Sequence, residues 1–85
     1  MSWGRGEVWE WLGAPTDQVG SVNDPRTQLE FDETWNEKWI YRAGPDSEIR
    51  KVVLWFRYDL RGVFEPDGTR VPLPEEDAPS TAGGG

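Results

Sequence analysis

The sequence predicts a mainly β domain, a small antiparallel meander of four or five strands that is either open or curled into a half-barrel. Three observations indicate this class. Apolar side chains alternate along residues 49–60, β-branched and aromatic residues are concentrated there, and turn-forming residues separate this run from its neighbours. The chain has 85 residues, enough for one domain with a modest core. We therefore expect a single domain over residues 1–73.

The run at residues 49–60 is the most apolar part of the chain. As a strand it places one set of side chains on one face: Val52, Leu54, Phe56, Tyr58 and Leu60. The opposite face then carries Ile49, Lys51, Val53, Trp55 and Arg57. A helix would leave Leu54, Trp55 and Tyr58 outside its apolar stripe, so the strand fits better. Because the second face is half apolar, we expect the N-terminal segment or a second subunit to cover it.

Residues 34–42 are predicted to pair with this run. Their alternation places four side chains on one face: Trp35, Glu37, Trp39 and Tyr41. An alternating segment at 29–33 precedes them, with a break or bulge near 33–36. Pro45 fixes φ for a turn, so we expect residues 43–47 to join the two strands into an antiparallel hairpin.

The remaining segments of the domain are less regular. Residues 7–12 are too short for a helix to be stable alone, and their alternation predicts a strand. Residues 16–27 contain Gly20 and Pro25 and lack a sustained period, which predicts a loop with at most one helical turn. The Asp67-Gly68 pair between β-forming residues predicts a tight turn joining two short strands.

Residues 74–85 are rich in Pro, Gly and acidic side chains, which predicts a disordered tail. The last residues, Gly83-Gly84-Gly85, resemble the end of ubiquitin-like sulfur carriers, whose two terminal glycines are activated as an adenylate. That resemblance would imply a carrier role for the C-terminus. It covers these residues alone, and the early hairpin and long helix of that family are missing, so a flexible low-complexity end is the better interpretation.

The composition excludes several classes of site and partner. The chain has no Cys and no His, so it has no disulfides, no thiolate metal sites and no histidine general base. It lacks a long apolar run and a signal-peptide pattern, so we expect a cytoplasmic protein that does not enter membranes. A net charge of −7 disfavours nucleic-acid binding, although residues 42–61 carry more basic than acidic side chains.

Catalysis and metal binding have one candidate cluster, the carboxylates of Glu30, Asp32, Glu33 and Glu37. Their spacing does not match the alternating acidic residues and central Gly of an EF-hand loop. We therefore interpret the cluster as a solvated acidic edge and expect a protein that is not an enzyme and holds no cofactor and no metal.

Aromatic side chains on neighbouring strands are the best candidates for a binding surface, and Arg57 alternates with one of them. The predicted binding residues are Trp35, Trp39, Tyr41, Trp55 and Arg57. The same aromatic residues could instead pack in the core, and the basic residues could pair across strands. Because Glu37 lies within the row, we expect this face to be partly exposed. The sequence thus predicts a non-enzymatic interaction module that binds a protein partner, or itself, through this face.

Two other functions remain open from the sequence. A curled sheet could enclose an apolar or aromatic ligand among Trp35, Trp39, Trp55 and Phe56; such a protein would be monomeric and its Trp fluorescence would be quenched saturably. Alternatively, an acidic mimic of nucleic acid would bind its partner with a strong salt dependence and little sensitivity to Trp substitution.

Overall fold

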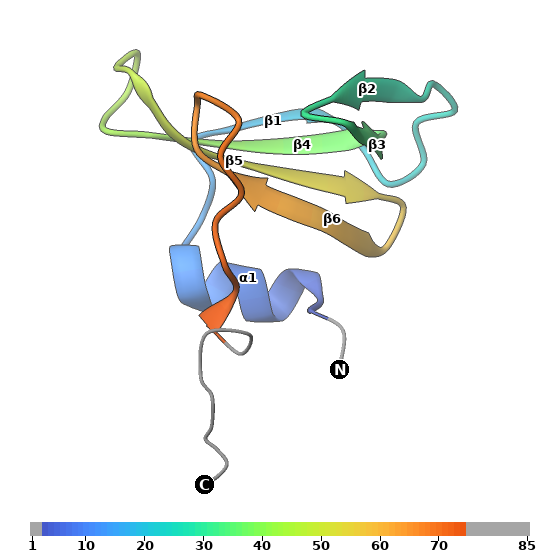
Figure 1. Ribbon diagram of the computed structural model, residues 1–85, viewed down its shortest axis with the longest axis horizontal. Helices are drawn as coiled ribbons and strands as arrows, with labels where there is room; N and C mark the ends of the chain where they lie inside the picture. Colours follow the sequence, from blue (N-terminus) through green and yellow to red (C-terminus); the bar gives the residue numbers. More distant parts are fainter. Residues whose placement is uncertain (1–2, 75–85) are drawn as a thin grey trace, which may run out of the picture.

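The computed structural model describes residues 3–74, and it is mainly β, with 43% strand against 12% helix. The elements in chain order are α1 (Arg5–Leu12), β1 (Asp17–Gly20), β2 (Gln28–Glu30), β3 (Glu33–Trp35), β4 (Glu37–Arg42), β5 (Ile49–Phe56) and β6 (Asp59–Phe64). Four strands form an antiparallel sheet in the order β1-β4-β5-β6, and β2 and β3 form a separate hairpin (Figure 1). The predicted fold class is confirmed, whereas the tail predicted after Pro74 lies outside the described residues.

The central hairpin formed by β4 and β5 has its predicted turn. Ala43 N donates to Glu48 O at 3.0 Å, and Ser47 N donates to Gly44 O at 3.0 Å. The turn at Asp67-Gly68 is also present, because Gly68 N donates to Glu65 O at 2.9 Å. These turns were predictable because Pro, Gly and Asp determine the backbone locally.

The strand at residues 49–60 is shorter than predicted. β5 ends at Phe56, and Arg57 and Tyr58 form a two-residue turn into β6. Arg57 has a φ of +58°, and its backbone N donates to the Asn36 side chain at 2.8 Å, which holds this left-handed conformation. The prediction that Tyr58 and Leu60 continue the apolar face of β5 is therefore wrong.

Both faces of the four-stranded sheet are covered. One face packs against α1 through a cluster of buried residues: Val8, Trp39, Val53, Trp55 and Val63. The opposite face forms a second buried cluster with Phe31 from the β2–β3 turn packed against it: Trp35, Val52, Leu54 and Phe64. Figure 1 shows α1 below the sheet and the β2–β3 hairpin above it. The sequence predicted that the N-terminal segment or a second subunit would cover the half-apolar face of β5. The structure shows that the N-terminal segment covers it.

The segment predicted as a strand at residues 7–12 is helix α1. Glu7 caps the start of the helix, because its carboxylate accepts a hydrogen bond at 2.9 Å from Gly4 N, a backbone donor without a partner inside the helix. The helix ends at Leu12, and the following residue, Gly13, caps it by donating its backbone N–H to Trp9 O at 2.7 Å. Eight residues are marginal for an isolated helix, so contacts of buried Val8 with the sheet stabilise it. No helix within residues 3–74 is long and apolar enough to span a membrane.

Two further predictions of local structure need correction. The predicted loop at 16–27 contains β1, which pairs with β4. Because all residues of β1 are exposed, its sequence lacks the apolar alternation by which a strand can be predicted. Residues 29–33 do not form one strand, because Phe31 and Asp32 adopt left-handed φ values of 54° and 64° and reverse the chain into the β2–β3 hairpin. The predicted break near 33–36 falls at Asn36, between β3 and β4.

Candidate functional site

The structure separates the residues predicted to form one binding face. Trp39 and Trp55 are buried in the cluster between the sheet and α1, and the partly buried Tyr41 packs against the same cluster. Trp35 is buried on the opposite face of the sheet, because Asn36 interrupts the strand and its alternation between Trp35 and β4. Arg57 is exposed in the β5–β6 turn. The predicted common face is therefore wrong for Trp35.

Trp39 and Trp55 are diagonal neighbours on adjacent strands. The register of β4 and β5 places Glu37 opposite Trp55 and Trp39 opposite Val53. The two indole rings pack with centroids 5.0 Å apart and planes inclined by 57°. Aromatic contacts at such a centroid distance add roughly 0.5–1.5 kcal/mol beyond area burial. The two rings thus form a rigid apolar floor on the α1 side of the sheet.

Arg5, the first residue of α1, lies on this aromatic floor. Its guanidinium carbon is 4.9 Å from the centroid of Trp55, 5.7 Å from that of Trp39 and 5.9 Å from that of Tyr58. Arg5 Nη2 donates to Glu37 Oε1 and, at 2.9 Å, to the backbone oxygen of Arg57. Glu37 Oε2 accepts from Trp39 Nε1 at 2.8 Å. We call Trp39, Trp55, Tyr58 and Glu37 the aromatic cage. No local pattern in the sequence indicates that Arg5 fills it.

Buried Asn36 fixes the geometry around the cage. Its backbone N donates to Trp55 O at 2.9 Å, and its side-chain oxygen accepts from Arg57 N at 2.8 Å. Its amide nitrogen donates to the backbone oxygens of Val22 at 3.2 Å and Asp24 at 3.1 Å. These contacts do not involve α1, and they position the β5–β6 turn that carries Tyr58 and the Arg57 carbonyl.

The acidic cluster is divided among separate ion pairs. Glu30 accepts from Lys38 Nζ at 2.9 Å, and Glu33 contacts Arg70 at 2.6 Å and Arg61 at 3.3 Å. Within residues 3–74, no group of three or more carboxylates is placed to hold a metal ion. Glu30 therefore pairs with one lysine, Glu33 with two arginines and Glu37 with Arg5.

Two large aromatic side chains are exposed here, Tyr58 of the cage and Trp9 of α1. Tyr58 is 73% exposed and Trp9 is 49% exposed. Tyr58 contacts the Arg5 guanidinium, and Trp9 packs edge-on against Trp39 with centroids 6.0 Å apart. We call the side of the sheet that carries Trp39 and Trp55 the aromatic face, and Trp9 and Tyr58 its exposed margin. The helix also presents the exposed carboxylates Glu7 and Glu10.

Tyr41 anchors the end of α1 on the same side of the sheet. Its hydroxyl donates to Gly13 O at 2.9 Å. Burial raises the pKa of Tyr41 to about 12. The phenol is therefore neutral at physiological pH and acts as a hydrogen-bond donor.

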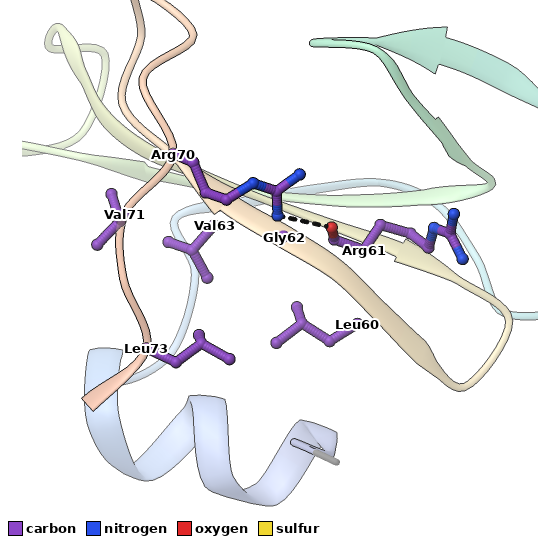
Figure 2. Close-up of a pocket in the computed structure, with 7 residues that line it drawn as sticks. All are labelled: Leu60, Arg61, Gly62, Val63, Arg70, Val71 and Leu73. Atoms are coloured by element: carbon purple, nitrogen blue, oxygen red, sulfur yellow. Dashed lines mark hydrogen bonds between the residues drawn. The ribbon is translucent and has the colours of Figure 1, made fainter. Parts of the chain in front are cut away.

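A small cavity of about 130 Å³ lies between β6 and the segment that follows the Asp67-Gly68 turn. Figure 2 shows its apolar side chains, Leu60, Val63, Val71 and Leu73, on the side of the sheet that faces α1. Arg70, which donates to Arg61 O at 3.2 Å, closes it near Gly62. Ligand pockets typically enclose about 300–1,000 Å³, so this cavity is too small for a drug-sized ligand.

The ligand site predicted among Trp35, Trp39, Trp55 and Phe56 is not a common enclosure, because none of the four lines this cavity and Trp35 lies across the sheet from Trp39 and Trp55. The aromatic cage with its exposed margin is therefore the candidate site. No family model, curated protein or solved structure matches this chain.

Proposed function

We propose that the protein is a non-enzymatic interaction module that binds a basic segment of a protein partner at the exposed margin of its aromatic face. The supporting observation is the exposure of Trp9 and Tyr58 directly beside the buried cluster. Trp and Tyr are the side chains most often found as energetic anchors of interfaces. Two exposed anchors on a rigid floor offer a partner apolar contact at little entropic cost.

Charge favours a basic partner over a second copy of the chain. The net charge is −7, and the carboxylates of Glu7 and Glu10 are exposed on α1. Aromatic faces attract cations with roughly 0.5–1 kcal/mol at exposed sites. Two copies of so acidic a protein repel each other, whereas a basic segment gains from the negative net charge and from the rings.

The test is a fluorescence titration of the full chain with hexa-arginine and hexa-glutamate peptides. We expect a saturable change in Trp emission with hexa-arginine and none with hexa-glutamate. Tyr58→Ala should weaken binding about threefold to fivefold, the loss of one exposed cation–π contact. Leu29→Ala is the matched control, because Leu29 is also 73% exposed but lies on β2. Equal loss in both variants would contradict the proposed surface.

A further inference from the structure

We propose that the aromatic cage binds an arginine side chain of the partner and that Arg5 occupies this cage in the isolated chain. The origin of the arginine rests on the proposed function, whereas the cage itself rests on geometry. Three rings lie within 5.9 Å of the Arg5 guanidinium, and a carboxylate and a backbone carbonyl accept its N–H groups. Arg5 therefore shows which chemical group the cage accepts.

The cage belongs to the sheet and its turn, and α1 supplies its occupant. Glu37 and Trp39 are on β4, Trp55 is on β5 directly opposite Glu37, and Tyr58 is in the following turn. The bond from Trp39 Nε1 orients the Glu37 carboxylate without help from Arg5. Because the rings and acceptors of the cage lie outside α1, an equivalent group from another chain can meet the same partners that Arg5 meets.

The occupant is held by a short element and is reachable from solvent. α1 has eight residues, and Val8 is its buried residue. The Arg5 side chain is 29% exposed, whereas that of Glu37 is 9% exposed, so the cage opens outward on the Arg5 side. Tyr58, at 73% exposure, stands at this opening. An incoming arginine thus meets the exposed margin first and then competes with Arg5.

The acceptors select a guanidinium over a quaternary ammonium. Arg5 Nη2 donates both to Glu37 Oε1 and to Arg57 O. A planar guanidinium supplies several N–H donors in a fixed fork, while a tetraalkylammonium supplies none. A quaternary ammonium would satisfy the rings and leave the Arg57 carbonyl unpaired.

The first experiment empties the cage with Arg5→Ala and adds methylguanidinium. We expect saturable binding at millimolar concentration, seen as a shift of the Trp39 indole N–H resonance and a rise in Tm. Tetramethylammonium should bind at least about tenfold more weakly, because it lacks donors. If the variant is unfolded, methylguanidinium should refold it. Arg42→Ala is the control and should gain no binding, because it removes an arginine of similar exposure, 27% against 29% for Arg5, whose partner Asp17 lies outside the cage. Absence of binding or refolding by methylguanidinium would overturn the proposal.

The second experiment tests displacement with the peptide Gly-Ser-Arg-Ser-Gly and its lysine counterpart. The Arg5→Ala variant lacks the internal competitor for the cage. It should therefore bind the arginine peptide at least about tenfold more tightly than the wild-type chain does. Equal affinity in both chains would overturn the proposal while leaving the proposed function intact. If neither chain binds the peptide but methylguanidinium enters Arg5→Ala, the partner assignment fails and the cage remains a guanidinium site.

Discussion

Arg5 Nη2 donates to Glu37 Oε1 and thereby joins α1 to the four-stranded sheet across 32 positions of sequence. Glu37 also accepts the indole N–H of Trp39, so one carboxylate links the helix to the core. A nearly buried charge of this kind is costly when its partner is removed. The same ion pair therefore determines both the docking of α1 and the occupancy of the cage.

Arg5→Ala should lower the free energy of unfolding by about 2–4 kcal/mol, near the value for breaking a buried pair. Arg42→Ala should cost about 0–1 kcal/mol, because the Arg42–Asp17 pair is more exposed. Urea unfolding monitored by Trp fluorescence measures both. Similar losses in the two variants would show that Glu37 is solvated rather than dependent on Arg5.

Asn36→Ala should destabilise the protein by about 2–4 kcal/mol, since it leaves several backbone groups without partners. Asn23 is an exposed residue of the same type on the preceding loop, and Asn23→Ala should change stability by no more than about 0.5 kcal/mol. Thermal unfolding of the two variants gives the comparison. An Asn36→Ala protein as stable as Asn23→Ala would be inconsistent with the described hydrogen bonds.

Gly6→Ala and Gly13→Ala should have opposite effects. A Cβ meets no atom within 4 Å at either position, but Gly13 has a φ of +83° while Gly6 lies inside α1. Gly6→Ala should therefore stabilise by about 0.5–1 kcal/mol through helix propensity. Gly13→Ala should destabilise by about 1–3 kcal/mol through backbone strain. Denaturant midpoints decide the sign, and a stabilising Gly13→Ala would contradict the observed helix end.

The raised pKa of Tyr41 predicts that the free energy of unfolding decreases at alkaline pH. Its pKa is raised from 10.0 to about 12, so the folded state prefers the neutral phenol. Its contribution is fully present below pH 10 and is lost as pH rises toward 12, because the unfolded chain ionises first. The difference in stability between the wild-type chain and Tyr41→Phe should therefore shift against the wild type over that range. A constant difference would mean that the hydroxyl is solvated.

Much of the sheet was predictable because its signals are local. β5 combines alternation with β-branched residues, and Pro45 and Asp67-Gly68 determine their turns. Helix α1 was missed because Trp9 and Trp11 alternate as in a strand, while its stability comes from Arg5 and Val8 contacts with distant residues. A glutamate at the third helical position, Glu7, was the available signal for its start.

The candidate site was predictable only in part. The sequence placed Trp39 and Trp55 on neighbouring strands, and their rings do pack together. The Arg57-Tyr58 turn lacks Gly and Asn, so no local sequence signal indicates it. The positive φ of Arg57 is held by a long-range hydrogen bond from its backbone N to the Asn36 side chain. This turn places Tyr58 and Arg57 O against the Arg5 guanidinium. Because the turn was not predictable, the binding site of Arg5 was not predictable either.

The most direct measurement is the NMR assignment of the Arg5 side chain in the isolated, full-length protein. Stacking of its guanidinium over Trp55 and Trp39 predicts strong upfield ring-current shifts of the Arg5 δ protons and NOEs from them to the Trp55 ring. Arg5 δ protons at random-coil shifts, without NOEs to Trp55, would contradict a cage filled by the N-terminal helix.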